Sequence, residues 1–132
     1  MDSLQRNPVL GHITTFGGHP VCCAAGLAAL VYILDNRLVD QVERKGLRYE
    51  NALKDAPNVL EIRRSGLLMA VELGTSDKLF QIMALFKEHG IMSDWFLFCD
   101  TAFRISPPLT ISDEEIDDSC QIILNCLNLL TE

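Results

Sequence analysis

VLEIRRSGLLMAVEL, at residues 59–73, contains two strand-like runs separated by Gly66. The first run, 59–64, and the second, 67–73, are bounded by turn-forming residues, and the glycine permits a reversal between them. Both alternating sides of the second run are largely apolar, which is typical of a strand in the interior of a sheet. The stretch therefore predicts a hairpin whose second strand is central.

Helical patterns precede this hairpin. Residues 20–34 are nearly all apolar or small, so we expect a helix that is buried on most of its sides. Asp35 or Asn36 is then expected to cap a second helix, which runs to about Ala56 and carries a narrow apolar stripe among charges. The stripe consists of Leu38, Val42, Tyr49 and Leu53. A stripe this narrow indicates that the second helix lies on a surface.

Two further helices are expected after the hairpin. Thr75 or Ser76 is expected to open the first of them, which stops at Gly90. Its inward side chains are expected to be Leu79, Ile82, Met83 and Phe86. The last helix begins at Ser112, because Ser112 and Glu115 have the spacing of a capping box. Its buried stripe is expected to be Ile116, Ile123, Leu127 and Leu130.

Between these helices, residues 91–105 predict two or three strands. Asp100-Thr101 is expected to form the turn between WFLFC (95–99) and AFRIS (102–106). The WFLFC run would promote aggregation as an exposed edge strand, so it is either core or an interface with another chain. The order of elements predicts an α+β fold, a small antiparallel or mixed sheet covered by helices.

The composition describes a globular chain and limits its partners. Of 132 residues, 48% are hydrophobic and 22% are charged, and a chain of this length can form a core without disulfides or metals. The formal net charge of −7 disfavours nucleic acid and anionic membranes as partners. The longest apolar run, 21–34, is too short to span a bilayer, and the N-terminal residues lack an export signal. We therefore expect a cytoplasmic protein.

No metal site and no catalytic residue is predicted within this chain. The five cysteines form no C-x-x-C pair, and they are interpreted as reduced core residues. The histidines are not at metal-ligand spacings, and only His19 is placed where it could touch a ligand. The lysines fall among the charges of amphipathic helices, where a solvated ammonium is a poor nucleophile. They are Lys45, Lys54, Lys78 and Lys87.

A loop before the first helix is the first candidate site. In HITTFGGHP, residues 12–20, Gly17 and Gly18 can adopt positive φ and expose successive N–H groups. Thr14 and Thr15 add hydroxyl donors. The loop therefore predicts a phosphate site, although the same residue types also form ordinary turns before helices.

Arg104 is the second candidate. It lies between Phe103 and Ile105, so strand alternation directs those two side chains to one face and the guanidinium to the other. The rigid Pro107-Pro108 pair follows. A fixed guanidinium can hold both oxygens of a carboxylate. The other interpretation is a surface arginine paired with an acidic side chain.

Three separated segments resemble one family. HITTFGGHPVCCAAGLAAL, RRSGLLMAVEL and FRISPPLTISDEEID occur in this order. Together they are similar to the C-terminal part of class III pyridoxal-phosphate aminotransferases, the group of the ornithine, acetylornithine and 4-aminobutyrate enzymes. They resemble the family's T-F-G-G-N-P segment with its interdomain helix, its R-G-x-G-L strand pair, and its R-x-x-P-P-L strand with the closing helix. The resemblance covers nearly the whole chain from about Gly11.

The resemblance implies roles for the candidate residues. Thr15, with Thr14 and the backbone near Gly17, would bind the phosphate of pyridoxal 5'-phosphate in the partner subunit of a homodimer. Arg104 would hold a substrate carboxylate. The implied reaction moves an amino group between an amino acid, expected to carry an ω-amino group, and a 2-oxo acid. The family's Schiff-base lysine lies upstream of any residue here, so we expect this chain to be inactive alone.

The resemblance also implies a domain organisation. Residues 1–19 would end the large cofactor-binding domain, 20–34 would form the interdomain helix, and 35–132 would form the small C-terminal domain. His19 stands where the family usually has Asn, and Arg64 where Gly is usual; the first departure concerns the loop's hydrogen bonds and the second the geometry of the first hairpin. The alternative is a stand-alone, non-catalytic α+β binding or interaction module.

Overall fold

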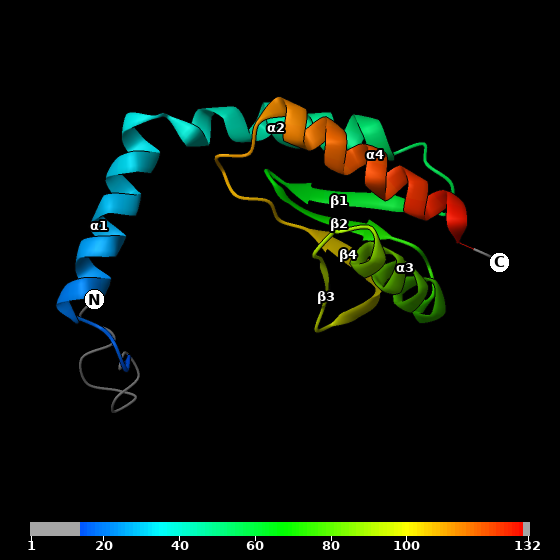
Figure 1. The fold of residues 1–132 in the computed structure, drawn as a ribbon, viewed down its shortest axis with the longest axis horizontal. Helices are drawn as coiled ribbons and strands as arrows, with labels where there is room; N and C mark the ends of the chain where they lie inside the picture. Colours follow the sequence, from blue (N-terminus) through cyan, green and yellow to red (C-terminus); the bar gives the residue numbers. More distant parts are fainter. Residues whose placement is uncertain (1–13, 131–132) are drawn as a thin grey trace. The chain divides into compact units, whose positions relative to one another are not determined.

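The computed structural model describes residues 14–130, which divide into two compact units that meet between Arg37 and Leu38. The predicted loop residues His12 and Ile13 lie outside the described residues. The first unit contains the rest of that loop and helix α1 (Pro20–Asp35), coloured blue to cyan in Figure 1. The second unit contains the remaining described helices and strands.

Helix α1 begins where the sequence predicts it. His19 is the N-cap, and its Nδ1 accepts a hydrogen bond from the Val21 N–H at 3.3 Å. Pro20 occupies the first helical position, where its missing N–H costs nothing. None of the helix's side chains is buried, so the prediction of burial on most sides is wrong for the described structure. The physical reason is that the described part of this unit holds no second element against which α1 could pack.

Helix α2 spans Leu38–Leu53 and starts later than predicted. Asn36 ends α1 instead of opening α2. Arg37, between the two helices, has a φ of +50°, which interrupts the helical path. The buried members of the predicted stripe are Leu38, Tyr49 and Leu53. The charged side of α2 remains exposed, so the helix lies on a surface as predicted.

The second unit contains a four-stranded antiparallel sheet in the order β1-β2-β4-β3. Its strands are β1 (Glu61–Ser65), β2 (Leu68–Glu72), β3 (Asp94–Phe96) and β4 (Cys99–Ile105). β2 lies between β1 and β4, which confirms the prediction of a central strand. Gly66 turns the chain between β1 and β2 with a φ of +60°, a conformation that favours glycine. The β1–β2 register is regular throughout, so Arg64 does not distort this hairpin.

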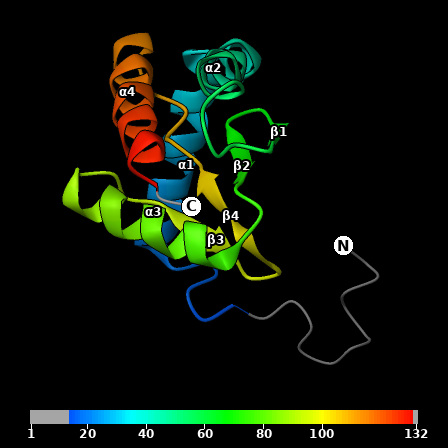
Figure 2. The ribbon, with the colours of Figure 1, turned by 90° about the vertical axis from the view of Figure 1, so that its right-hand side faces the viewer.

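Helices α2, α3 (Ser76–Glu88) and α4 (Asp113–Leu129) cover one face of this sheet (Figures 1 and 2). Both α3 and α4 begin at predicted caps. The Thr75 side chain accepts a hydrogen bond from the Lys78 N–H, and Ser112 forms the capping box with Glu115. The core between the helices and the sheet includes the fully buried side chains Leu53, Met69, Val71, Leu73, Leu79, Ile82, Phe86, Phe103, Ile116 and Leu127. The α+β fold is therefore confirmed.

The β3–β4 hairpin differs from the prediction. Asp100 and Thr101 lie inside β4, and the turn consists of residues 97–98, between the paired Phe96 and Cys99. The two turn side chains are 90% and 102% exposed, so the core alternative for WFLFC is wrong at the tip. The interface interpretation stays a prediction. The sequence did not predict this turn because both of its residues are apolar, whereas turns usually contain Gly, Pro, Asn or Asp.

The cysteines are only partly in the core. Cys120 and Cys126 are buried in α4, and burial raises the pKa of the Cys120 thiol to about 12. Cys22 and Cys23 are exposed on α1, which buries no side chain, and Cys99 is half-buried. The prediction of core cysteines is therefore right for two of the five, and all five are free thiols.

Among residues 14–130, no group of His, Cys, Asp and Glu is arranged to hold a metal ion. No single described helix has the length and apolar character needed to cross a membrane; α1 and α2 counted together pass that test by length and composition alone.

Candidate functional site

The sheet of the second unit carries different residues on its two faces. The side chains that alternate with the core residues of β1, β2 and β4 lie on the face opposite the helices, which we refer to as the open face. The register places Arg63 beside Ala70, Ala70 beside Arg104, and Arg104 beside Asp94. These residues form one row across the open face, the charged row. Arg104 therefore lies on the face that strand alternation predicts.

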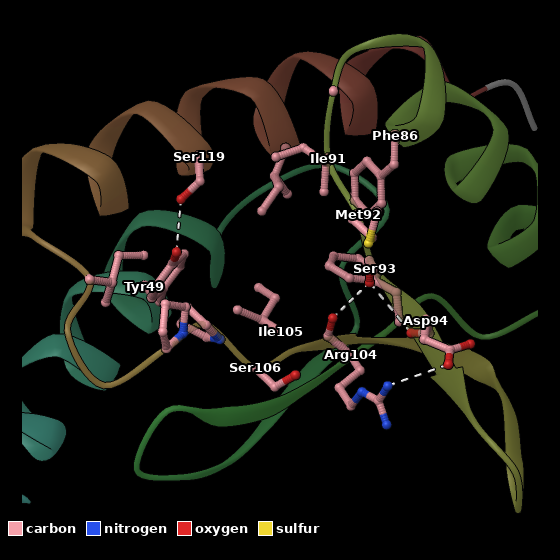
Figure 3. A pocket seen from close by; sticks show the side chains of 16 residues that line it. Tyr49, Phe86, Ile91, Met92, Ser93, Asp94, Arg104, Ile105, Ser106 and Ser119 are labelled. Atoms are coloured by element: carbon pink, nitrogen blue, oxygen red, sulfur yellow. Dashed lines mark hydrogen bonds and ion pairs between the residues drawn. The ribbon is translucent and has the colours of Figure 1, made fainter. Parts of the chain in front are cut away.

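Arg104 is positioned by three contacts. Its Nη2 donates to Asp94 Oδ2 at 3.3 Å, and its guanidinium carbon lies 6.0 Å from the centroid of the Phe96 ring. Its backbone carbonyl accepts a hydrogen bond from Ser93 Oγ at 2.7 Å. Figure 3 shows the guanidinium directed toward Asp94. The Arg104 side chain is 37% exposed, so the guanidinium is accessible to an anion. Asp94 is also the acidic partner that the surface-pair interpretation of Arg104 requires.

Arg63, in the same row, is engaged by two carboxylates. Its Nη1 donates to Glu61 at 2.7 Å and its Nη2 donates to Glu72 at 2.9 Å. Burial tends to raise the pKa of Glu72, but hydrogen bonds to its carboxylate, including the one from Arg63, outweigh burial and hold this pKa below its usual value. Arg63 is therefore neutralised within the fold more completely than Arg104 is.

A cavity of about 650 Å³ lies beside Arg104, between β4 and the helices (Figure 3). Its wall includes the apolar side chains of Phe86, Ile91, Ile105 and Ile123. Tyr49 Oη and Ser119 Oγ, also in the wall, are 2.8 Å apart and hydrogen-bond to each other. Burial raises the pKa of the Tyr49 phenol, which therefore stays neutral. Arg104 is the only cation among the described residues that line the cavity, but its guanidinium is directed toward Asp94 on the open face, not into the cavity.

A buried lysine fixes the segment that follows Arg104. Lys45 is 4% exposed, and its Nζ donates to the Leu109 carbonyl oxygen at 3.0 Å. The prediction that every lysine is a solvated surface charge is therefore wrong for Lys45. Lys45 is three residues after Val42 and four before Tyr49, which places it on the apolar stripe of α2. This spacing could have predicted from the sequence that Lys45 is buried.

Arg64 points toward α2. Its Nε donates to Glu50 at 2.8 Å, and its Nη1 and Nη2 donate to Glu43 at 2.9 and 2.8 Å. The hydrogen bonds to Glu43 and Glu50 raise the pKa of Arg64. A Cβ at Gly46 would collide with the Gly66 carbonyl oxygen, so α2 approaches the hairpin turn closely because position 46 is glycine. The departure at Arg64 thus ties β1 to α2.

The loop of the first unit carries the other candidate residues. Thr14, Thr15 and Gly17 are exposed. Gly18 has a φ of +78° within the turn, and a Cβ at Gly17 would collide with the Thr14 hydroxyl. The Thr14 side chain therefore packs against the backbone at position 17 because that residue is glycine. Hydroxyl groups and exposed backbone N–H groups are suitable donors for a phosphate, so the residues present fit one.

His19 has a structural role in the same loop. Its ring nitrogen Nδ1 accepts the Val21 N–H, so this side chain caps α1. The imidazole therefore satisfies a backbone donor at the helix start.

Asp94 is the site residue that sequence reasoning missed. A turn at Asp100-Thr101 would place Arg104 opposite Leu97. The observed turn places Arg104 opposite Asp94 instead. The signal available in the sequence was the polar Ser93-Asp94 pair directly before the aromatic run, which marks where the edge strand begins.

Comparison with known proteins identifies the class of this α+β domain. A model of the family described as Aminotransferase class-III matches residues 2–127. The chain therefore belongs to the class III aminotransferase family.

Particular relatives support this assignment. Ornithine aminotransferase 2 of Staphylococcus aureus is 38% identical over 108 residues, which cover 80% of this chain and 26% of the relative. An acetylornithine aminotransferase of Caldanaerobacter subterraneus is 31% identical over 121 residues, covering 89% of this chain and 30% of the relative. The solved ornithine aminotransferase of Toxoplasma gondii superimposes with a TM-score of 0.74 at 35% identity, covering 96% of this chain and 30% of that protein. This chain thus spans between a quarter and a third of the length of these relatives.

Proposed function

We propose that this chain forms the C-terminal part of a pyridoxal 5'-phosphate-dependent aminotransferase that moves an amino group from an ω-amino donor to a 2-oxo acid. Membership of the class III family supports the amino transfer. The relatives include ornithine and acetylornithine aminotransferases, whose substrates carry an amino group at the end of the side chain. In this proposal residues 1–19 end the large domain, 20–34 form the interdomain helix, and 35–132 form the small domain.

The observation that carries the proposal is the guanidinium of Arg104 on the open face. Its acidic partner among the described residues is Asp94, at 3.3 Å, and more than a third of the Arg104 side chain is exposed. Arg104 would bind a substrate carboxylate through charge-assisted hydrogen bonds. The Ser93 contact to its backbone and the Lys45 contact to the following loop would keep the guanidinium in place.

The loop of the first unit would bind the cofactor phosphate. The hydroxyls of Thr14 and Thr15 and the backbone at Gly17 would donate to it, with Thr15 reaching the cofactor of the partner subunit in a homodimer. When bound, the cofactor supplies the electron sink for the amino transfer. The free thiols of this chain suit a reducing compartment, which supports a cytoplasmic enzyme.

The lysines support the proposal that this chain is inactive alone. Lys45 donates to a backbone carbonyl, Lys54 to Asn51 and Lys78 to Asn58. These three side chains hydrogen-bond within the fold, and Lys87, the fourth lysine, lies in the last turn of α3. In this proposal the Schiff-base lysine lies in the large domain, as the family resemblance implies.

The kinetic test uses the full-length enzyme that contains this chain. Arg104→Ala should raise KM for carboxylate-bearing substrates by roughly tenfold to a hundredfold, the effect of losing a charge-assisted contact of about 1.5–3 kcal/mol. Arg104→Lys keeps the positive charge but lacks the planar guanidinium, so its KM should lie between the values of the unmodified enzyme and of Arg104→Ala. Lys54→Ala, which removes a cation in the turn directly after α2, is the control and should leave KM unchanged. An unchanged KM in Arg104→Ala would return Arg104 to the role of a surface ion pair.

A second test separates the proposal from the stand-alone binding module. The 132-residue chain, mixed with pyridoxal 5'-phosphate and passed through gel filtration, should not retain the visible absorbance of a lysine-bound cofactor. A retained band would contradict the proposal. In the coding DNA upstream of Met1, a long in-frame segment with a lysine site is expected, whereas a stop codon would support the stand-alone module.

A further inference from the structure

The two edges of the sheet carry different side chains. β1, at one edge, contains the charged residues Glu61, Arg63 and Arg64. β3, at the other edge (Figure 1), has the sequence DWF, and its only partner strand among the described residues is β4. Charged side chains on an edge strand discourage pairing with another chain, whereas an apolar edge strand favours it. β3 is therefore the edge at which a further strand can be added.

Apolar side chains follow this edge along its whole length. Met92 precedes β3 and is fully exposed, Trp95 lies within the strand, and the two exposed turn residues follow. The Trp95 ring packs edge-on against Phe80 of α3, with centroids 5.9 Å apart. This contact extends the apolar surface from the sheet onto the helical layer, where Phe80 remains 55% exposed. We refer to this surface as the aromatic edge, and it consists of Phe80, Met92, Trp95, Leu97 and Phe98.

The size of the aromatic edge indicates a protein partner. Its five side chains leave roughly 700 Å² of surface in contact with solvent. The largest apolar patch on a typical monomer is smaller, about 300–600 Å². Two copies that meet through this surface would cover about 1,400 Å² in total, within the range of specific and stable interfaces. The area is therefore sufficient for a dimer of this chain.

A second copy also fits the symmetry and charge of this surface. In a dimer with two-fold symmetry the same surface lies on both sides of the interface, so an edge strand can pair with its own copy. The five side chains of the aromatic edge are uncharged, so the pairing places no like charges against each other among them. The acidic residue of β3, Asp94, already has a cationic partner in Arg104 of the same copy. Neither form nor charge therefore opposes the pairing.

We propose that the aromatic edge is a self-association surface, at which β3 of one copy lies antiparallel beside β3 of a second copy. This dimer buries the exposed turn of the β3–β4 hairpin, which accounts for apolar residues at Leu97 and Phe98, where turns usually carry polar ones. The surface belongs to the second unit, whereas the proposed phosphate loop belongs to the first. The inference therefore does not depend on the proposed function.

The test uses Trp95, the only tryptophan of the chain, whose fluorescence reports on the aromatic edge alone. Emission, acrylamide quenching and sedimentation velocity are measured for the 132-residue chain from low to high micromolar concentration. The sedimentation coefficient should rise toward that of a dimer. Over the same range Trp95 emission should move to shorter wavelength and its quenching should decrease. Sodium chloride should strengthen the association, because it screens the repulsion between two copies that each carry a net charge of −7.

Two variants disrupt the aromatic edge at different places. Phe80→Glu places a carboxylate on both sides of the interface, and glutamate is a good helix former. Leu97→Ser with Phe98→Ser changes the turn and leaves α3 intact. Each should weaken the dimer by about tenfold or more, with an unchanged circular dichroism spectrum because the replaced side chains are exposed.

Two controls remove exposed apolar side chains elsewhere. Leu60→Ser lies next to β1 at the opposite edge, and Leu27→Ser lies on α1. Both should associate as the unmodified chain does. A Trp95 spectrum that does not change with concentration would overturn the inference, even if the chain self-associates. A dimer that salt weakens, or that Leu27→Ser disrupts and the aromatic-edge variants do not, would also overturn it. These results leave the proposed amino transfer intact, because none of them concerns Arg104 or the phosphate loop.

Discussion

The covered face and the open face of the same sheet contribute differently to this molecule. On the covered face, Met69, Val71 and Phe103 are at most 1% exposed and pack against the helices. On the open face, Arg63 and Arg104 retain 43% and 37% exposure. Successive residues of a strand point to opposite faces, so one step along β4 separates a core aromatic from a guanidinium available to a ligand. The core thus holds the Arg104 guanidinium in a fixed position, although Arg104 itself contributes little to the stability of that core.

Phe103→Ala should have the largest effect, because it removes a side chain of the covered face. Phe103 is fully buried, and its ring packs edge-on against Phe86 with centroids 5.1 Å apart. The cavity left behind should lower the free energy of unfolding by about 3–5 kcal/mol. Urea denaturation of the 132-residue chain measures this loss. Arg104→Gln changes the next residue, on the open face, and should lose much less unfolding free energy. An equal loss in the two variants would contradict the distinction between the faces.

Gly46→Ala should have the next largest effect, because it pushes α2 away from the β1–β2 turn. The added Cβ would collide with the Gly66 carbonyl oxygen and come within 2.8 Å of Arg64 Nη1. We expect a loss of about 1–3 kcal/mol in urea denaturation. Gly26→Ala in α1, where nothing lies within 4 Å of the added Cβ, is the control and should be neutral or stabilising by about 1 kcal/mol at most. Equal effects at the two glycines would contradict the close approach.

Acid should weaken the ion pairs between α2 and α4 on the covered side. Hydrogen bonds from Arg44 to Asp113 and from Arg48 to Asp117 lower the pKa of both carboxyl groups below 3.8. A carboxyl group with a lowered pKa in the folded state stabilises the fold above its unfolded pKa, and this contribution disappears as the pH falls through the folded value. The urea concentration at the midpoint of unfolding should therefore decrease when the pH is lowered below about 4.

The matched variant for the acid experiment is Asp113→Asn with Asp117→Asn. It should show a lower midpoint at neutral pH and a smaller further fall in acid, because the titrating pairs have been removed. The same acid response in the variant and the unmodified chain would show that other groups control it.

Leu97→Ser with Phe98→Ser should have the smallest effect on stability. Both side chains are exposed at the tip of the β3–β4 hairpin, so unfolding free energy should change by no more than about 0.5 kcal/mol. If this tip is an interface, as one interpretation of the WFLFC run predicts, sedimentation velocity should show less self-association in the variant. A large loss of stability would mean that the tip belongs to the core.

Local signals were sufficient to predict much of the fold. The hairpin at residues 59–73 combines two strand patterns with a glycine turn, and Ser112 with Glu115 forms a cap within four residues. Both features depend on neighbours in sequence, and both are confirmed. Strand alternation alone predicts that Arg104 lies on the face opposite Phe103 and Ile105, and the structure places it there.

The remaining features depend on contacts that no local pattern contains. Asp94 lies beside Arg104 only in the observed register of β3 and β4. That register could not be predicted because the two residues of the turn are apolar and give no turn signal. Lys45 is buried because the loop after β4 supplies a carbonyl oxygen from 64 residues away. Helix α1 is exposed because the described part of its own unit holds no other helix or strand to cover it. The apolar pattern of residues 20–34 carries no information about that.

The most direct test of the central claim, that Arg104 provides binding while the covered face provides stability, is thermal denaturation of the 132-residue chain with and without glutarate. Without glutarate, Arg104→Gln and the unmodified chain should unfold at nearly the same temperature. Glutarate at constant ionic strength should raise the Tm of the unmodified chain, because a ligand that binds only the folded state stabilises it. It should leave the Tm of Arg104→Gln unchanged. A variant that unfolds well below the unmodified chain without glutarate, or an equal glutarate shift in both, would contradict the account.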